Sequence, residues 1–468
     1  MFRSAALPLL ISAAVVGSGA RLTPRVVSSF ASSPPSPPSP PSFAGAHSYP
    51  TGPDPVSVAI ADLNGDGKPD LATANSGKGA NTLSILLNRG DGSYGPKRDY
   101  ATGRRPATVA IGDLNSDGNP DLATANVDAG TVSVLLNKGD GSLQAKLDYR
   151  AGNASLSVAI GDLNGDVKPD LAVARSVAGG AVSVLLNRGD GTFRAKLDYP
   201  TGTYAEAVAI GDLNGDAKPD LAVPNLGEGA VSVLLNKGDG TFRVKRDYDA
   251  GNEPLSVAIG DLNGDGKPDL AVSNDGGNYS PEFQPAGSVS VLLNRGDGTF
   301  RTQRVYPTGS VSPPSVAIGD LNGDGKPDLV TANSDGSGTV SVLLNKGGGS
   351  VQAALFYPIG RVRRFHRSVA IGDLNGDDRP DLATVAFGKT VSVLLAKPAV
   401  VCAVPNVTGT TRARAERTIA SAHCRVGKIG RAYSNRVKKG RVIWENPEPR
   451  TVLPNRGKVN IVVSLGKR

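Results

Sequence analysis

The sequence predicts an all-β protein, a seven-bladed β-propeller followed by a small α+β domain. Glycine supplies 59 of the 468 residues and aromatic residues only 5%, which favours many tight turns over long helices. A phrase of the form Ser-Val-Ala-Ile-Ala-Asp-Leu-Asn-Gly-Asp-Gly-Lys-Pro-Asp-Leu-Ala recurs at a period of about 50 residues. This period fits propeller blades better than leucine-rich or ankyrin units, and a parallel β-helix is the alternative. The first Asp of the phrase falls at Asp62, Asp113, Asp162, Asp212, Asp261, Asp320 and Asp373.

Each repeat contains four runs that are typical of short antiparallel strands. Asp/Asn/Gly clusters separate the runs, and a Gly-Asp-Gly turn precedes the last one. The seventh repeat lacks a fourth run, whereas segment 43–52 resembles one, so we expect this segment to complete the last blade and close the ring. In the third repeat the predicted strands are Ser157–Leu163, Leu171–Ala174, Ala181–Leu186 and Thr192–Tyr199.

The sequence predicts four parts, three of which lie outside the repeats. Residues 1–20 have a basic start at Arg3, an apolar run and a Ser-Gly-Ala end, as in a signal peptide. An uncleaved anchor is the alternative, and no later stretch reaches the roughly 20 apolar residues of a membrane span. Residues 21–44 form a Ser/Pro-rich linker, 45–397 the propeller and 400–468 the small domain. We expect a secreted, extracellular or cell-wall-associated monomer with no transmembrane segment after cleavage.

The small C-terminal domain carries the basic charge of the chain. Residues 399–468 contain 15 Lys and Arg but only 3 Glu, against a net charge of +8 for the whole sequence. Residues 411–422 are expected to form its helix and 458–464 a strand. The two cysteines of the chain, Cys402 and Cys424, both lie here, and a secreted chain with two cysteines in one small domain usually pairs them.

The repeated Asp/Asn loop predicts a calcium site in each blade. In the first loop Asp62, Asn64 and Asp66 alternate, and Lys68 (through its carbonyl) and Asp70 follow. Hard oxygen ligands with three carboxylates favour calcium over zinc. The spacing follows an EF-hand loop through position nine, but position twelve is never Glu. The alternative is that the Asn-Gly-Asp-Gly sequence only forms a turn and binds no ion.

These repeats resemble the FG-GAP/VCBS repeats of integrin-α-type β-propellers, which implies an extracellular setting and up to seven calcium ions. The resemblance implies equivalent ligands in every copy. The full set is Asp62, Asn64, Asp66, Lys68 and Asp70; Asp113, Asn115, Asp117, Asn119 and Asp121; Asp162, Asn164, Asp166, Lys168 and Asp170; Asp212, Asn214, Asp216, Lys218 and Asp220; Asp261, Asn263, Asp265, Lys267 and Asp269; Asp320, Asn322, Asp324, Lys326 and Asp328; Asp373, Asn375, Asp377, Arg379 and Asp381.

Position six of each loop is expected to need a left-handed backbone. Glycine fills it in four loops, where positive φ costs nothing. The three exceptions are Val167, Ala217 and Asp378. Because β-branched valine tolerates positive φ worst, the third loop is predicted to be the weakest calcium site.

The C-terminal domain is similar to a PASTA domain, a family associated with peptidoglycan. The resemblance rests on Val404–Gly409, the following helix, Gly427, residues 437–443 and a closing strand. Trp444–Pro449 departs from the usual turn, and the domain is single. A stability or spacer role is therefore the alternative to peptidoglycan binding.

The functional prediction is a binding or adhesion module for a glycan, peptidoglycan or another acidic surface polymer, and neither an enzyme nor a nucleic-acid binder. A polysaccharide-processing enzyme and a structural scaffold are the alternatives. Two variable connections on the face opposite the calcium loops supply ligand candidates, with a solvated charged loop as the plain alternative. The candidates are Tyr279, Phe283, Arg361, Arg363, Arg364 and Arg367. Three Arg-Gly-Asp triplets are interpreted as hairpin turns, because Lys-Gly-Asp or Lys-Gly-Gly fills the same place elsewhere.

Overall fold

A computed structural model describes residues 40–276, 287–359, 366–386, 388–398, 401–454 and 457–468. The predicted signal peptide and most of the predicted linker lie outside these residues. No helix in the described part of the chain is long and apolar enough to cross a membrane.

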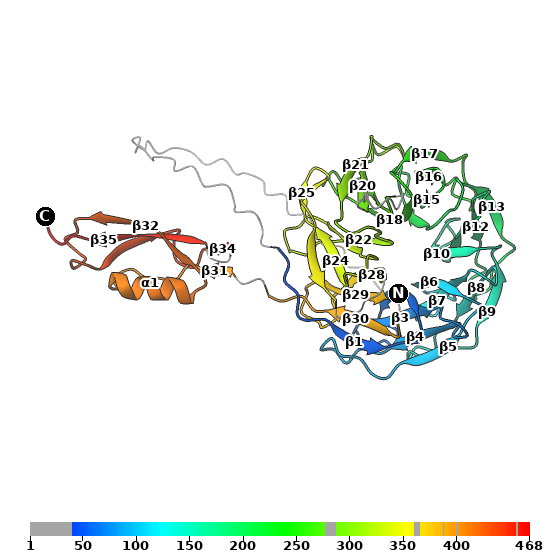
Figure 1. Cartoon of the computed structure of the whole chain (residues 1–468), viewed down its shortest axis with the longest axis horizontal. Helices are drawn as coiled ribbons and strands as arrows, with labels where there is room; N and C mark the ends of the chain where they lie inside the picture. Colours follow the sequence, from blue (N-terminus) through cyan, green and yellow to red (C-terminus); the bar gives the residue numbers. More distant parts are fainter. Residues whose placement is uncertain (1–39, 277–286, 360–365, 387, 399–400, 455–456) are drawn as a thin grey trace, which may run out of the picture. The chain divides into compact units, whose positions relative to one another are not determined.

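The repeats fold into seven four-stranded antiparallel sheets, here called blades one to seven, arranged around a common centre (Figure 1). The all-β propeller class predicted from the sequence is confirmed. The strands of blades one to four are β2 (Pro55–Ala61), β3 (Asp70–Asn75), β4 (Thr82–Leu86), β5 (Arg98–Ala101); β6 (Pro106–Gly112), β7 (Asp121–Asn126), β8 (Thr131–Leu135), β9 (Leu147–Arg150); β10 (Ser155–Gly161), β11 (Asp170–Arg175), β12 (Ala181–Leu185), β13 (Leu197–Pro200); β14 (Ala209–Gly211), β15 (Asp220–Asn225), β16 (Ala230–Leu234) and β17 (Arg246–Asp249).

Blades five to seven follow the same pattern, and a two-stranded hairpin, β25–β26, forms the turn before the last strand of blade six. Their strands are β18 (Pro254–Gly260), β19 (Asp269–Asn274), β20 (Ser288–Leu292), β21 (Arg304–Pro307); β22 (Ser315–Gly319), β23 (Asp328–Ala332), β24 (Thr339–Leu343), β25 (Asn345–Gly347), β26 (Ser350–Val351), β27 (Leu355–Pro358); β28 (His366–Gly372), β29 (Asp381–Ala386), β30 (Thr390–Leu394) and β1 (His47–Pro50).

The strand boundaries in blade three differ from the sequence prediction by up to five residues, most of all in the first and fourth strands. The first strand ends at Gly161, because the amide of Leu163 donates to the side-chain carboxylate of Asp170 and not to a backbone carbonyl of β11. The fourth strand begins at Leu197, because Phe193 still belongs to the turn, where it forms an isolated bridge with Asn187.

Blade seven is closed by the N-terminal segment, as the sequence predicted. Strand β1 pairs antiparallel with β30, and Tyr49 lies opposite Val391. The closing segment begins at residue 43, as predicted, since Phe43 bridges Ala396 and its ring packs edge-on against Tyr357 at 5.0 Å. The Tyr357 hydroxyl also donates to the carbonyl of Pro41 at 2.7 Å. The boundary drawn at residue 45 therefore falls inside the last blade.

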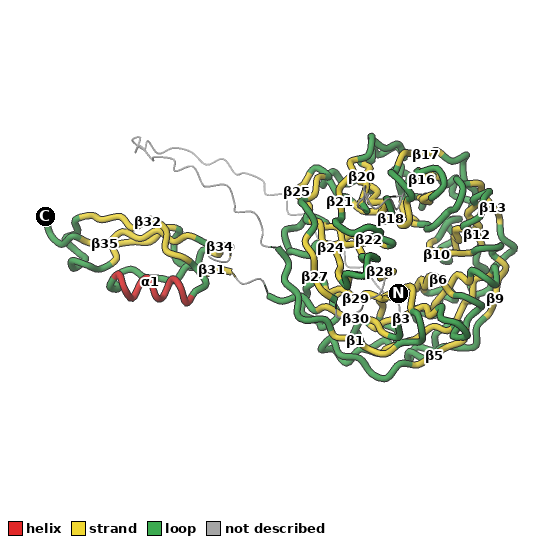
Figure 2. Tube along the Cα trace, viewed as in Figure 1, coloured by secondary structure: helices red, strands yellow, loops and turns green. Residues whose placement is uncertain are grey.

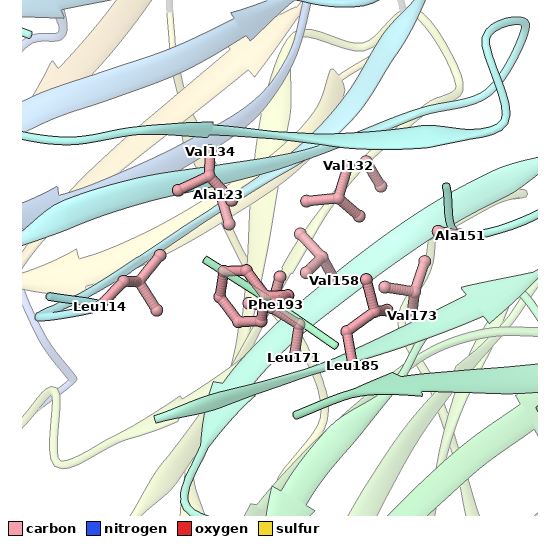
Figure 3. Packing of buried hydrophobic residues seen from close by; sticks show 11 residues of the cluster. Leu114, Ala123, Val132, Val134, Ala151, Val158, Leu171, Val173, Leu185 and Phe193 are labelled. Atoms are coloured by element: carbon pink, nitrogen blue, oxygen red, sulfur yellow. The ribbon is translucent and has the colours of Figure 1, made fainter. Parts of the chain in front are cut away.

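The hydrophobic core lies between neighbouring blades. Between blades two and three, Leu114 and Val134 meet Leu171, Leu185 and Phe193, all buried (Figure 3). The alternating Val, Ala and Leu residues of the strands thus fill the space between two sheet faces. Each blade is stable only through its neighbours, because one sheet alone leaves an apolar face uncovered.

The C-terminal domain packs the α-helix α1 (Arg412–Ser421), the single helix among the described residues, against short strands (Figure 2). Thr411 and Ala422 cap the helix, in agreement with the predicted range. The predicted disulfide is present: Cys402 and Cys424 are joined, and both are buried in the domain core. The strands form the sheets β32-β35-β33 and β31-β34, with bounds β31 (Val401–Ala403), β32 (Arg425–Ala432), β33 (Val442–Asn446), β34 (Val452–Pro454) and β35 (Lys458–Ser464).

Candidate metal centres

Each predicted metal loop joins the first and second strands of its blade. In blade one it runs from Asp62 to Asp70, between β2 and β3. The turn between the third and fourth strands lies at the same end of the blade, since successive antiparallel hairpins alternate ends. A Cβ placed on Gly90 in that turn would lie 2.9 Å from the Lys68 side chain. The loops and the Gly-Asp-Gly turns therefore share one face, as expected.

Backbone amides of the loop donate hydrogen bonds to the side chains of positions one, three and five. The Asp62 carboxylate accepts the amides of Asp66 and Gly67 at 3.1 and 2.7 Å. Asn64 Oδ1 accepts the Asp66 amide at 3.1 Å, and Asp66 Oδ1 accepts the Lys68 amide at 3.0 Å. The two bonds to the first Asp recur in the other six loops. These bonds hold each loop as a compact turn.

Position nine is a buried carboxylate that links the loop to the following turn. Asp70 is fully buried; its Oδ2 accepts the Leu63 amide at 2.9 Å and its Oδ1 the Asn88 amide at 2.7 Å. Burial raises the pKa of Asp70 to about 6, although the two amide donors oppose the shift. The negative charges of Asp66 and Asp62 add to the rise. The same pKa of about 6 applies to Asp121, Asp170, Asp220, Asp269, Asp328 and Asp381.

The donor chemistry of these loops fits a hard divalent cation. Three carboxylates, an amide oxygen and a carbonyl lie on nine residues, and oxygen ligands of this kind are what Ca²⁺ prefers. In loop six, Asp324 Oδ2 is buried and accepts no hydrogen bond, while the Lys326 ammonium lies 3.5 Å away. Among the described residues, however, no three His, Cys, Asp or Glu side chains stand together as a metal-binding group. The residue types fit calcium, whereas the carboxylates are not gathered as a ready coordination shell.

Position six has a left-handed backbone in every loop, as the sequence predicted. Gly67 has φ +79°, and a Cβ there would meet no atom within 4 Å. The three exceptions adopt the same conformation, with φ of +67° at Val167, +62° at Ala217 and +61° at Asp378. Val167 is also 85% exposed, so its side chain gains little from burial. The third loop therefore carries the backbone strain expected of a valine at positive φ.

Sequence reasoning missed the asparagine that ties six of the seven loops to the next blade. Asn187 of blade three donates from its side-chain amide to the Leu114 carbonyl in the loop of blade two, at 2.8 Å, and to the Pro169 carbonyl of its own blade. Equivalent bonds come from Asn88, Asn137, Asn236, Asn294 and Asn345. Blade seven has Ala396 at this place. The signal was present as an Asn before each of six Lys/Arg-Gly turns, but the partner lies in another repeat, 73 residues earlier in the chain for Asn187.

The Arg-Gly-Asp triplets serve the turns, as interpreted from the sequence. Asp190 Oδ1 accepts the amide of Thr192 at 2.9 Å, and Arg188 donates to the carbonyl of Phe193 at 2.6 Å. Both charged side chains of this triplet therefore bond within their own hairpin turn.

Five of the six ligand candidates lie outside the described residues, namely Tyr279, Phe283, Arg361, Arg363 and Arg364. Arg367, the sixth, belongs to strand β28 and lies on the face opposite the metal loops. The structure therefore places one candidate and leaves the other five as predictions.

The comparisons with known proteins agree with this architecture. A model described as an FG-GAP-like repeat matches residues 62–124, 113–173, 162–223, 225–272, 283–331 and 320–384, together more than half of the chain. The chain belongs to the FG-GAP-like repeat family. A second FG-GAP repeat model matches residues 254–292 of this FG-GAP-repeat protein, and the PASTA domain model matches residues 403–465.

Curated proteins gave no match to this FG-GAP-repeat protein. Among solved structures, BBS1N in complex with ARL6DN is 14% identical with a TM-score of 0.52, covering 76% of this chain and 97% of that one. Virginiamycin B lyase from Staphylococcus aureus is also 14% identical, with a TM-score of 0.50 and coverages of 76% and 99%. An Agrocybe aegerita lectin is 20% identical, with a TM-score of 0.49 and coverages of 74% and 86%. The first two likenesses show the fold alone.

Proposed function

We propose that this protein is an extracellular binding module whose PASTA domain attaches to a cell-wall glycopeptide polymer and whose propeller is stabilised by calcium. The observation that carries the first half is the PASTA match over residues 403–465, a domain with a large excess of basic residues. A basic surface attracts acidic polymers at long range. The buried disulfide between Cys402 and Cys424 supports an oxidising, extracellular setting.

Calcium is assigned to the loops by their oxygen donors. In blade one Asp62, Asn64, Asp66 and Asp70 would hold the ion together with the Lys68 carbonyl. The bound cation would neutralise three carboxylates that otherwise repel one another. Its role in this proposal is structural, since loop, turn and neighbouring blade are already joined through Asp70 and Asn137.

Polymer binding is tested by co-sedimentation of the full-length protein with purified peptidoglycan, with chitin as a neutral polymer and polygalacturonate as an acidic one. We expect retention on peptidoglycan that falls at least fivefold when Arg436, Lys438 and Lys439 are all changed to Ser. These three side chains are exposed on the PASTA domain.

A matched control changes Arg194, Arg243 and Arg301 to Ser, which removes the same charge from exposed positions of the propeller. Equal losses in both variants would show that only net charge matters and would contradict a PASTA-domain site. New reducing ends in the supernatant would instead favour the enzyme alternative, and no retention on any polymer the scaffold alternative.

Calcium binding is tested separately by equilibrium dialysis and by melting in calcium and in chelator. Asp62→Asn should remove one bound ion, whereas Asp91→Asn in the neighbouring turn should remove none. Asp91 is the matched control because it lies outside the nine-residue loop, in the neighbouring turn, where its carboxylate likewise accepts a backbone amide, that of Ser93, at 2.9 Å. Absence of bound calcium in the unmodified protein would refute the assignment without touching the polymer result.

A further inference from the structure

A central cavity of about 640 Å³ opens on the face opposite the metal loops. All seven blades line it with residues at the beginnings of their first strands or just before them. Its volume lies within the range of small-molecule sites, and its wall mixes apolar side chains, hydroxyls and a few charges. None of the groups described above as candidate metal ligands contributes to this wall.

One ring of equivalent positions, six residues before the first Asp of each loop, forms part of the wall. Five of the seven positions are apolar, and the remaining two carry opposite charges. In blade order the ring reads Val56, Ala107, Leu156, Glu206, Leu255, Pro314 and Arg367.

The two charges lie on opposite sides of the cavity. The first strands pack in the cyclic order β2, β6, β10, β14, β18, β22 and β28. Glu206 lies three residues before β14, the inner strand of blade four, and Arg367 belongs to β28 of blade seven. Two blades separate them in one direction and three in the other, which is as far apart as a seven-membered ring allows.

The positive side contains a second arginine. Arg105 of blade two also lines the cavity. Partial burial of Arg367 lowers the pKa of its guanidinium group, and the positive charge of Arg105 lowers it further. Two acids moderate this side. Asp54 opposes the shift at Arg367, and Asp128 pairs with Arg105 at 3.4 Å. Both side chains of the Arg105–Asp128 pair are at least half exposed, and such a pair is worth little and exchanges partners easily.

The negative side has no such compensation among the described residues. Glu206 is half-buried, its Oε1 accepts the Ser176 hydroxyl at 2.6 Å, and it takes part in no ion pair within the described chain. Blade four is rebuilt around it: the inner strand β14 is shortened to Ala209–Gly211, and Ala205 forms only an isolated bridge with Asn225. An acid held in a cavity wall without a cation is a natural partner for an ammonium group.

Hydroxyl groups surround the space between the two charges. Ser57, Thr108 and Ser157 each accept the amide of a valine in the next blade, at 3.1–3.3 Å. A hydroxyl that accepts in this way still has its own hydrogen to donate. The wall can therefore donate hydrogen bonds to carbonyl oxygens of a ligand that spans the cavity.

We propose that the central cavity binds a short zwitterionic peptide, with its ammonium group at Glu206 and its carboxylate at Arg367 and Arg105. A peptide supplies both charges at its ends and carbonyl oxygens between them. Its two ends match the two charged sides, and its small side chains match the apolar ring positions. This site is distinct from the polymer binding proposed above, and either one can fail without the other.

The test is ligand-observed NMR titration of the full-length protein with alanine peptides of two to five residues. Because the two charged sides are fixed, we expect affinity to peak at one peptide length. At that length, N-acetylation or C-terminal amidation should each weaken binding at least tenfold. Glu206→Gln, which retains an oxygen for Ser176, should weaken the free peptide at least tenfold and leave the acetylated peptide unchanged.

Two further variants complete the design. Arg367→Gln and Arg105→Gln should weaken the free peptide but not the amidated one, and Leu255→Gln, an uncharged position of the same ring, should change either by less than threefold. A thermal melt of each variant confirms that it folds. Equal binding of free and capped peptides, no binding of any length, or binding of D-glucuronate in preference to every peptide would overturn the proposal.

Discussion

The strained valine in the third loop gives the sharpest test of the loop geometry. Val167→Gly removes a Cβ from a residue with φ +67°. A left-handed backbone costs a residue with Cβ about 1–2 kcal/mol. Glycine offsets about 0.4–1 kcal/mol of this gain, because it increases the conformational entropy of the unfolded chain. The valine side chain is 85% exposed, so little buried surface is lost. The backbone amide that donates to Asp162 at 2.8 Å is kept.

The balance predicts that Val167→Gly raises the free energy of unfolding by about 0.5–1 kcal/mol. Urea denaturation measures this change, which is small in a domain of this size and is read best from the midpoint at constant m-value. The gain should be larger in calcium than in chelator, and the affinity of the third loop should rise up to about tenfold, since about 1.4 kcal/mol is a factor of ten.

Gly67→Val in the first loop is the matched reverse change. The space around a Cβ at Gly67 is open, so its cost reports the backbone conformation alone. We expect this variant to be destabilised by an amount similar to the gain from Val167→Gly. If Val167→Gly destabilises the calcium-loaded protein, or Gly67→Val is neutral, positive φ at position six is not a source of strain.

Three other predictions concern the buried carboxylates, the asparagine links and the closure of the ring. In chelator, stability should fall as the pH rises from about 4 to 6, because the folded state raises the pKa of Asp70 and its equivalents to about 6 and so binds more protons than the unfolded chain over this interval. Melting temperatures that rise between pH 4.5 and 6 would contradict this. Asn187→Ala should lower the free energy of unfolding by about 2–3 kcal/mol, because it leaves buried carbonyls of two blades without their donor. A loss below about 0.5 kcal/mol in urea denaturation would show that these bonds contribute little. Deleting residues 1–50 should cause self-association, seen by light scattering, because it exposes the edge of β30, whereas deleting residues 1–39 should not. If the variant that lacks residues 1–50 stays monomeric, β1 is not needed to protect the edge of β30.

The sequence was sufficient for features that depend on local pattern or on repetition. The period predicted the blades, the missing fourth strand of the seventh repeat predicted the closing segment, and glycine at position six predicted the sign of φ at Val167. It was insufficient where the partner of a residue lies in another repeat. Nothing near Asn187 identifies the Leu114 carbonyl, which only the packing of blade three on blade two brings within 2.8 Å.

The central cavity shows the same limit more strongly. Glu206 and Arg367 are separated along the chain, and only the closed ring makes them face one another across one space. Arg367 was selected from the sequence for its place in a basic loop, whereas Glu206 was overlooked as a lone acid. The departure of the fourth repeat, Glu-Ala where most copies have an apolar residue and a hydroxyl, is the signal that was available.

The shared last blade has a consequence for synthesis on the ribosome. Ser48 and Ser392 bond across β1 and β30 at 3.1 Å, although 344 positions separate them in the chain. At about 5–20 residues per second, the ribosome needs on the order of 20–70 seconds to make the intervening chain. During that time blade one lacks its neighbour, blade seven, and segment 43–50 has no strand with which to pair. The nascent propeller therefore exposes one face of blade one until its final repeat has been synthesised.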